Sequence, residues 1–444
     1  MGRDRTGSYD AAVATAIEQH MAWLLERIVD RGAGLTTEEM AEHLVPRDGR
    51  QLEGLRGGFG MWGDRVGDPM VVHDRAVADD GLTATTILEG ERGRRWELTC
   101  RLDSDDGEIG SYSLERCLPE GVEIRDATPD DAGALADLYR SIPMVAGDLQ
   151  VTIDIGDDYF ASTRLMPESR TLIATDHGRA IGLYTGTRFP SMLNGRECTV
   201  ILGCHTRIDA GKAGGGVWSR MNRQLVDHFS DHYDAAMAFV LTGNTAASRL
   251  TTAGAWPAGP VRTVIACGAL DVDAGSPCRP ATPDDAEEIA DILNETHGGR
   301  ELFRPYTAES LAGRLERAPD IYGWGSVWIT DGAVVGVGER FHHRVTKSPT
   351  EERHSTRAIV YDYGYRVGTP GSEAAFLALL GARARAVAAV GATHLSIFTT
   401  EPAPAYATLA RLADSLEQYD LLVPPVPPDT DAETRGVYVD QAIF

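Results

Sequence analysis

Two spacings of apolar residues divide the chain into predicted helices and strands. Apolar residues that recur every three to four positions predict helices, whereas alternating or short continuous apolar runs predict strands. The first part of the chain changes from the helical spacing to a spacing of two. It predicts two helices and four strands: Ala11–Arg31, Thr37–Leu44, Met70–Ala76, Thr83–Leu88, Trp96–Leu102 and Gly110–Leu114. Helices followed by an antiparallel meander predict a small α+β domain over residues 1–118.

The remainder of the chain repeats one order of elements. The first copy predicts strand Val122–Arg125, a helix from Thr128, strands Thr171–Asp176, Ala180–Thr187 and Cys198–His205, helix Val217–Phe229, strand Ala235–Leu241 and helix Thr245–Ala253. The second predicts helix Thr282–Asn294, strands Val327–Thr330, Val334–Glu339 and Ala358–Tyr363, helix Ser372–Val390, strand His394–Thr399, helix Ala405–Ser415 and strand Gly436–Phe444. We therefore expect two domains of one fold, residues 121–268 and 277–444.

Matching residues indicate that the two copies arose by tandem duplication. The segment Arg125–Ala132 (RDATPDDA) returns as Arg279–Ala286 (RPATPDDA), 154 positions later, and Gly182 and Gly336 keep the same step. That step is longer than a solenoid repeat and suits a whole domain. In each copy threonine is placed to cap a helix, proline is tolerated in its first turn, and carboxylates favour the positive end of its dipole.

Charge and cysteine content narrow the class of protein. The chain has 66 acidic and 42 basic side chains, a net charge of −24. This disfavours nucleic acids and anionic membranes, which need a positive field, and is compatible with a cationic small molecule. No apolar run approaches the roughly 18 residues of a membrane span. Six cysteines without a C-x-x-C pair, and a start without a signal-peptide pattern, predict reduced thiols in the cytoplasm.

The loop Gly211–Gly216 (GKAGGG) has the form of a pyrophosphate cradle. Backbone N–H groups at a helix N-terminus point at an anion, and glycines remove side chains that would keep the anion away. Lys212 adds a charge that can neutralise a phosphate. A P-loop would end in Gly-Lys-Ser/Thr, and a dinucleotide fingerprint would lie in the first βα unit, so neither fits. From the sequence of this loop alone, a glycine-rich surface turn is an equally good interpretation.

The whole series of elements resembles the GNAT superfamily of acyl-CoA-dependent N-acyltransferases. The resemblance rests on the Thr-Pro-Asp-Asp helix starts, the hairpins at Ala180-Ile181-Gly182 and Val334-Val335-Gly336, the glycine-rich loops and Asn244 after the next strand. It covers Gly121–Phe444 and implies an α/β (α+β) fold of two tandem GNAT-like mixed-sheet domains. It also implies acetyl-CoA or another acyl-CoA, with two strands that splay apart to admit the pantetheine and the acceptor amine. The element order of residues 1–118 resembles the cone-shaped fold of the nuclear-transport-factor and polyketide-cyclase superfamily.

The resemblance places acyl-CoA contacts in both copies. In the first they are Asn244 and the loop residues Lys212, Ala213, Gly214, Gly215 and Gly216, although Gly211 stands where the family usually has Gln or Arg. In the second they are Arg366, Gly368 and Gly371, and Pro370 removes one N–H donor. We expect the first copy, with the more complete cradle, to bind the acyl-CoA.

Acyl transfer to an amine needs a route for the amine proton. The buried strands offer Glu197 and His205 in the first copy and Asp362 in the second. The resemblance implies a general-acid tyrosine in the helix after the next strand; the first copy has Leu250 there, and the second has Tyr406 in that helix. Each of these residues can instead be a satisfied structural residue, and we expect Cys204 to be a small buried hydrophobe.

These expectations lead to three hypotheses. The first is an acyl-CoA-dependent N-acyltransferase that uses an acetyl donor and transfers the acyl group directly to the amine of a small molecule. The acidic chain is compatible with a cationic acceptor. The second is a catalytically degenerate protein that binds an acyl-CoA or a metabolite, which the missing tyrosine favours. The third, transfer from aminoacyl-tRNA, needs a basic face that the net charge disfavours. We expect no nucleic acid, membrane or metal as partner, and a homodimer is left open.

Overall fold

The computed structural model describes most of the chain. The described residues are 6–33, 35–44, 58–59, 61–64, 66–67, 70–90, 94–103, 107–213, 216–229, 233–248, 254–255, 260–270, 278–423 and 436–441. Gly214, Gly215 and Leu250, which the sequence analysis singled out, lie outside them. The chain divides into two compact units, Met1–Glu120 with Ala213–Arg220, and Gly121–Lys212 with Met221–Phe444.

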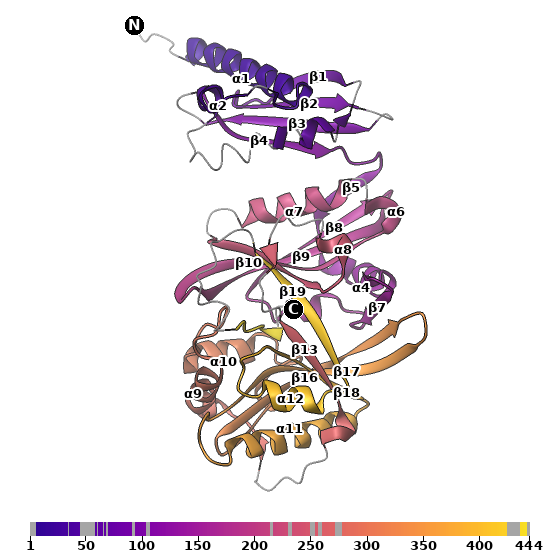
Figure 1. Cartoon of the computed structure of the whole chain (residues 1–444), viewed down its shortest axis with the longest axis vertical. Coiled ribbons are helices and arrows are strands. Elements are labelled where there is room, and N and C mark those ends of the chain that lie inside the picture. Colours follow the sequence, from indigo (N-terminus) through magenta and orange to yellow (C-terminus); the bar gives the residue numbers. More distant parts are fainter. Residues whose placement is uncertain are drawn as a thin grey trace. The chain divides into compact units, whose positions relative to one another are not determined.

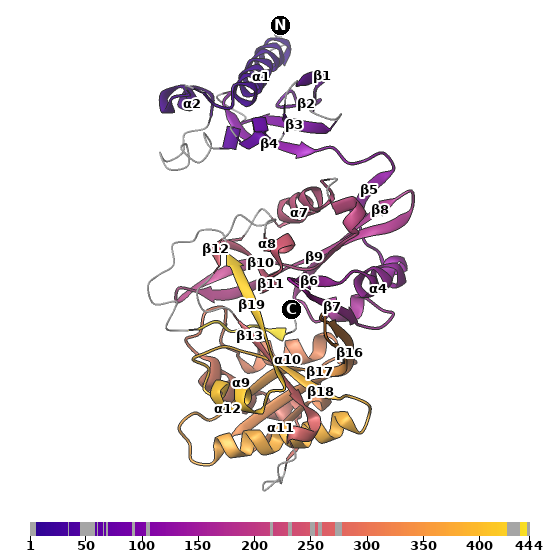
Figure 2. The same ribbon diagram turned by 45° about the vertical axis from the view of Figure 1, so that its right-hand side comes forward.

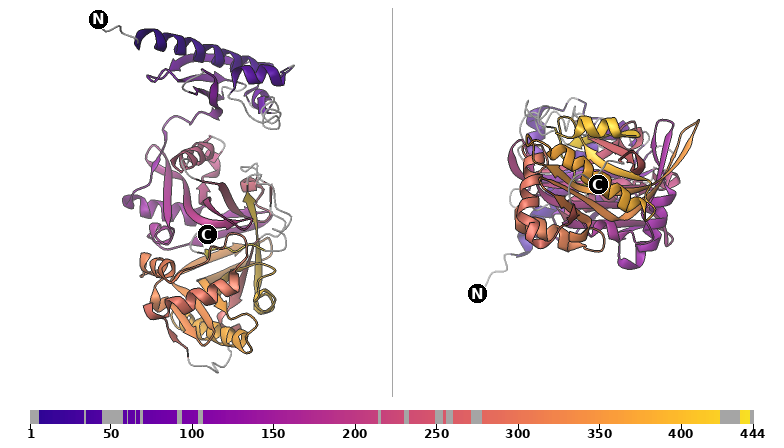
Figure 3. Two further views of the ribbon diagram at one scale, coloured as in Figure 1. Left: turned by 90° about the vertical axis from the view of Figure 1, so that its left-hand side faces the viewer. Right: turned by 90° about the horizontal axis from the view of Figure 1, so that it is seen from below.

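The first unit contains a four-stranded antiparallel sheet with a helix along one face (Figure 3). Its strands follow chain order: β1 Val71–Val77, β2 Thr83–Glu89, β3 Arg95–Leu102 and β4 Ile109–Arg116. Helix α1 (Thr6–Val29) contributes a stripe at helical spacing to a core shared with the sheet, namely Ile17, Met21, Leu24 and Ile28. Helix α2 (Thr37–His43) begins after Thr36, whose hydroxyl accepts a hydrogen bond from the backbone N–H of Glu39. These elements agree with the predicted helices and meander, and the cone-fold resemblance stays a prediction.

The second unit carries most of the two repeats. The first repeat contains β5 Val122–Asp126, α4 Ala132–Ser141, β6 Met144–Ala146, β7 Leu149–Asp154, α5 Phe160–Thr163, β8 Glu168–Asp176, β9 Arg179–Leu193, β10 Arg196–Ile208, α6 Ala210–Ala213, α7 Val217–His228, β11 Ala235–Leu241, α8 Thr245–Ser248, β12 Gly254–Ala255 and β13 Val261–Ala266. The second contains β14 Arg279–Pro280, α9 Ala286–His297, α10 Ala308–Arg317, β15 Val327–Thr330, β16 Ala333–Lys347, β17 Glu352–Tyr365, α11 Ser372–Ala388, β18 His394–Thr399, α12 Tyr406–Leu412 and β19 Ser415–Val423.

The strands of both repeats form one 15-stranded sheet within the described residues. Its main path is β14-β15-β16-β17-β18-β13-β19-β11-β10-β9-β8-β5, so β13 of the first repeat lies between two strands of the second. In return β19, yellow in Figures 1 and 2, pairs with β11 of the first repeat. The exchange also joins the cores, because Phe398, Tyr419 and Leu421 belong to the same apolar cluster as Leu202 of the first repeat.

The duplicated helix start has the same hydrogen bonds in both repeats. Arg125 donates both terminal nitrogens to Asp131 at 2.7 and 2.8 Å, and Arg279 does the same to Asp285 at 2.7 and 2.6 Å. In each repeat the carboxylate also accepts the backbone N–H of the capping threonine at 2.8 Å. A short 3₁₀ turn, Pro129–Asp131 or Pro283–Asp285, precedes the α-helix proper. The repeated sequence is therefore a repeated capping motif.

Two expectations about strands were wrong, and one strand pairing was not predicted. The predicted closing strand Gly436–Phe444 is, among its described residues, an isolated bridge of Val437 to Glu301, and β19 supplies the last strand instead. The hairpin strands β16 and β17 are longer than predicted, because their charged tips (residues 340–357) hide the alternation while still pairing along the ladder. On its other edge β16 pairs with β7, which was not predicted.

Candidate active site

Each repeat contains one pair of parallel strands that separates partway along its length. In the first repeat the pairing of β10 with β11 covers Val200–Gly203 and Ala235–Ala238, and both strands then continue without pairing to each other. In the second the pairing of β17 with β18 covers Arg357–Ile359 and His394–Ser396. Each repeat therefore has the pair of diverging strands that the resemblance implied, and we call the region beyond each pairing a wedge.

The two wedges differ in exposure. In the first repeat Gly203, Cys204 and His205 on β10, and Ala238 and Phe239 on β11, are all partly exposed. In the second repeat every residue from Val360 to Tyr365 and from Ile397 to Thr399 is buried.

Tyr363 closes the wedge of the second repeat. Its hydroxyl donates to the carbonyl of Phe398 at 3.2 Å, which links the two diverging strands. Phe376 of α11 stacks on Tyr365 at 5.6 Å between ring centroids and lies 5.9 Å from Tyr363. Aromatic side chains therefore occupy the second wedge, whereas the residues of the first are partly exposed, and in this sense we call the first wedge accessible.

His205 occupies a distorted part of β10 beside the first wedge. The register with β9 shifts between Cys204 and Arg207, so two residues of β10 stand opposite one of β9. This is a β-bulge. His205 has a φ of 51°, a left-handed conformation that is uncommon outside glycine. Bulges re-aim side chains, and this one is next to the point where the strands separate.

A chain of polar side chains supports His205. Its Nδ1 lies 3.2 Å from the Tyr159 hydroxyl, which is 2.6 Å from the hydroxyl of Thr185. Thr185 is in turn 2.9 Å from Thr171. Burial raises the pKa of Tyr159 well above its ordinary value, so its phenol stays protonated. The ring of Tyr139 packs against His205 with centroids 5.3 Å apart. Tyr159 was missed by sequence reasoning because it lies 46 residues away, just before the short helix α5, in a segment without a motif.

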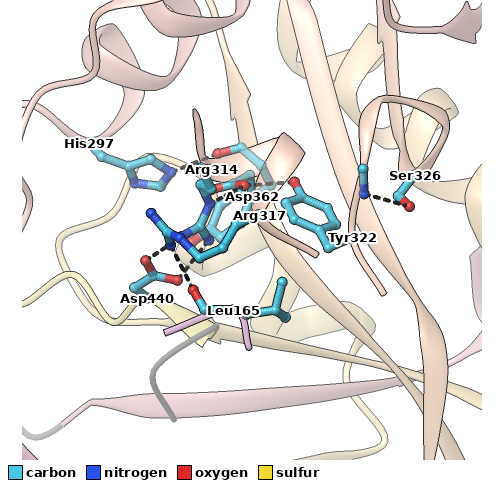
Figure 4. A network of polar contacts seen from close by, with 10 residues as sticks. Leu165, His297, Arg314, Arg317, Tyr322, Ser326, Asp362 and Asp440 are labelled. Carbon is cyan, nitrogen blue, oxygen red and sulfur yellow. Dashed lines mark hydrogen bonds and ion pairs between the residues drawn. The ribbon is translucent and has the colours of Figure 1, made fainter. Parts of the chain in front are cut away.

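Asp362 lies in a buried ion-pair network of the second repeat (Figure 4). It accepts hydrogen bonds from Arg314 Nε at 3.1 Å and the Tyr322 hydroxyl at 2.6 Å. Both terminal nitrogens of Arg314 donate to Asp440 at 2.7 Å. Burial raises the pKa of Asp362, Arg314 opposes that rise, and Asp440 adds to it. This set joins β17, α10 and the segment around Asp440, which is what a structural network does.

The other predicted catalytic residues do not meet His205. Glu197 is exposed near the start of β10, eight residues from His205 and therefore roughly 25 Å along the strand. Tyr406 is half-buried at the first residue of α12, and no described hydrogen bond connects it with Asp362. Burial raises the pKa of Cys204 to about 12, so its thiol is protonated and unsuited to nucleophilic attack.

The first glycine-rich loop is partly helical. Its first half forms α6, where the N–H groups of Gly211 and Lys212 donate to the side chain and carbonyl of Asp209. Lys212 Nζ forms an ion pair with Asp176 at 2.8 Å. Gly216 has a φ of 79°, which explains glycine at that position. The Asn244 side chain accepts a hydrogen bond from the N–H of Ala247 and so caps α8. Ala213 is the last residue of α6.

The second loop forms a well-defined helix start. Gly368 and Gly371 have φ values of 79° and 87°, and a Cβ at either would meet nothing within 4 Å. The hydroxyl of Ser372, the first residue of α11, donates to the carbonyls of Arg366 and Thr369 and closes the loop. The side chain of Arg366 lies 3.4 Å from Glu295. This helix start is exposed, but the wedge beside it is filled.

Two kinds of site were not found in the part of the chain that is described. No helix there has the length and apolar character that crossing a membrane requires. No group of three or more histidine, cysteine or acidic side chains there is placed to hold a metal ion.

Comparisons with known proteins give matches among solved structures. No protein-family model and no curated protein matches the chain. The Saccharomyces cerevisiae N-myristoyltransferase with bound myristoyl-CoA is similar with a TM-score of 0.49 and 9% identity, over 73% of this chain and 91% of that one. A GCN5-related N-acetyltransferase from Sphaerobacter thermophilus matches with a TM-score of 0.44 and 15% identity, over 69% and 96%. One from Kribbella flavida matches with 0.37 and 12%, over 68% and 70%. The strand topology shows a mixed α/β fold, as the sequence predicted, and each repeat has one parallel strand pair that separates partway along its length.

Proposed function

We propose that this protein is an acyl-CoA-dependent N-acyltransferase, with acetyl-CoA as donor and the amine of a small molecule as acceptor. The observation that carries the proposal is the difference between the wedges. The first is accessible beside a bulged strand with a histidine, whereas Tyr363 and Phe376 fill the second. We therefore assign donor binding to the first repeat and the shaping of the acceptor site to the second.

The first wedge fits the acyl arm of a coenzyme A thioester. Beyond Gly203, β10 has lost β11 as a ladder partner, so its backbone groups facing the wedge can bind an extended amide chain. The N–H groups in the bulge would donate to the thioester carbonyl oxygen and stabilise negative charge there. Lys212, released from Asp176, would pair with a phosphate.

His205 is the residue we assign to proton removal. We assign the Tyr159 hydroxyl as acceptor from Nδ1–H and as donor to Thr185, which places the lone pair on Nε2. That nitrogen would take a proton as the neutral amine attacks the carbonyl carbon and the carbon–sulfur bond breaks. The proton then passes to the departing sulfur, so the products are an amide and a free thiol.

The test is thiol release from acetyl-CoA and longer acyl-CoAs in the presence of a library of small amines. We expect release that depends on both the protein and the amine, together with the acylated amine in equal amount. Absence of amine-dependent release with every donor would overturn the assignment to an enzyme.

One observation favours a second function, the binding of an acyl-CoA without turnover. Lys212 already forms an ion pair with Asp176. A ligand phosphate that binds Lys212 would break this ion pair, as expected of a protein that senses the ligand. Acetyl-CoA binding without thiol release, over the full amine library, would support this second function.

A further inference from the structure

An open cavity of about 760 Å³ lies where the repeats exchange strands. Its walls come from both repeats: Leu241 and Thr242 at the end of β11 on one side, and residues of β16, β17 and β19 on the other. Because β11 is also one wall of the accessible wedge, the cavity adjoins the place where the acyl group would be presented.

The rim of the cavity carries partly exposed charged pairs, and burial lowers the pKa of His394, so at neutral pH this histidine does not compensate the charge of Asp414. Arg353 Nε lies 2.6 Å from Glu351 Oε1, and both side chains are more than half exposed. His394 Nε2 lies 3.5 Å from Asp414 Oδ2. Solvent-exposed pairs of this kind contribute little binding energy.

The floor of the cavity has an excess of positive charge. Arg344 and Arg357 share a single carboxylate, that of Glu417, at 2.8 and 2.7 Å. The three side chains are 2%, 8% and 12% exposed. The buried Nε of Arg344 has no hydrogen-bond partner among the described residues. A third guanidinium, that of buried Arg262, is on the strand position directly opposite Glu417.

The excess of buried positive charge lowers the stability of the fold unless an anion compensates it, because a buried charge loses its hydration. Burial would raise the pKa of Glu417, but Arg344, Arg357 and Arg262 outweigh that effect and hold it below its ordinary value. Burial and the like charge of Arg344 lower the pKa of Arg357 to about 10, so it remains protonated at neutral pH. Arg344 and Arg357 thus depend on the same carboxylate, that of Glu417.

We propose that Arg344 and Arg357 bind a carboxylate of the acceptor, so that the substrate is an amine that also carries a carboxylate. The proposal deepens the proposed function and rests on it. At the floor two arginines share one glutamate, which suits the binding of an anion there, and planar guanidinium groups match a carboxylate in shape.

The position of His342 connects the floor to the proposed base. His342 stands opposite Arg357 in the pairing of β16 with β17. Burial chiefly lowers the pKa of His342 to about 3, and the charges of Arg262, His205 and Arg357 lower it further. His342 is therefore adjacent in register to Arg357 of the floor, and we place the amine of the substrate on the side of His205.

The binding test uses a product-like monoanion, N-acetylglycine, and its neutral amide, N-acetylglycinamide, with the full-length protein and no coenzyme A. We expect N-acetylglycine to bind at least tenfold more tightly than the amide, and Arg344→Gln to weaken it about tenfold, the loss of one charge-assisted hydrogen bond. Glu417→Gln removes the competing carboxylate and should tighten binding. Lys347→Gln, on the same hairpin but not lining the cavity, is the matched control and should change nothing.

Equal binding of the acid and the amide, or no binding of either, would overturn the proposal, as would weaker binding in Glu417→Gln. Tighter binding of inorganic phosphate than of N-acetylglycine would overturn the choice of a carboxylate. If Arg344→Gln does not fold, the Glu417→Gln result still decides. Arginine-dependent binding of N-acetylglycine without any thiol release would leave the anion site standing and remove the transferase assignment, so the two failures are distinguishable.

Discussion

His205 and Asp362 show how residues of similar promise in the sequence take different roles. Both lie near the end of the central strand of a repeat. His205 has a left-handed backbone in a bulge beside an accessible wedge, with one ring nitrogen held by Tyr159. Asp362 is fully enclosed by Arg314 and Tyr322, which hold its carboxylate in place. Strand position could be predicted from the sequence, but these partners come from segments 40 or more residues away, so their contacts could not.

Replacement of His205 by Asn should lower the rate of thiol release about a hundredfold or more, because the proton acceptor is lost. Tyr159→Phe, which keeps the ring but not the hydroxyl, should lower it about tenfold. Initial rates from pH 5 to 9 measure both effects. Equal rates in the wild type and His205→Asn would remove His205 from the mechanism.

Elements were predicted best where the apolar pattern was strong. Strands β11, β15 and β18 have the predicted bounds, because short apolar runs between loops leave little choice of register. The tips of β16 and β17 were missed because they are held by pairing with each other and with β7, and not by an apolar face. Strand β19 was missed because its partners, β11 and β13, belong to the other repeat.

The duplicated capping motif predicts equal stability losses in the two repeats. Asp131→Ala and Asp285→Ala should each lower the free energy of unfolding by about 1–2 kcal/mol, through the lost cap and the lost pair with arginine. Asp130→Ala and Asp284→Ala, exposed neighbours outside the hydrogen-bonded motif, are the controls and should cost less than about 0.5 kcal/mol. Chemical denaturation at neutral pH measures the differences.

The same carboxylates predict a pH dependence. Hydrogen bonds from Arg125, and from Arg279 in the second repeat, hold the pKa of Asp131 and of Asp285 well below its ordinary value of 3.8. A lowered pKa stabilises the fold fully above the ordinary value, and that contribution is lost as the pH falls from there toward the native pKa. The difference in stability between the wild type and the two alanine variants should therefore shrink progressively as the pH falls below about 3.8. A difference that persists unchanged would contradict this account.

In the whole molecule, the exchange of strands β13 and β19 joins the two similar repeats into one sheet. The first repeat keeps an accessible wedge, and the second has filled its own. Through β16, β17 and β19, the second repeat instead supplies the arginine floor of the cavity beside β11. The repeated order of elements, and the expectation that the first copy binds the acyl-CoA, came from the sequence. The filled wedge and the arginine floor depend on packing between distant segments and could not be predicted.

The central claim is that the first repeat holds the donor, and calorimetric binding of acetyl-CoA tests it most directly. The matched variants are Lys212→Ala and Arg366→Ala, which remove the aligned basic residue from one repeat at a time. We predict that the wild type binds acetyl-CoA, that Lys212→Ala weakens binding about tenfold, and that Arg366→Ala leaves it unchanged. Binding lost only in Arg366→Ala, or no binding by the wild type, would contradict the account.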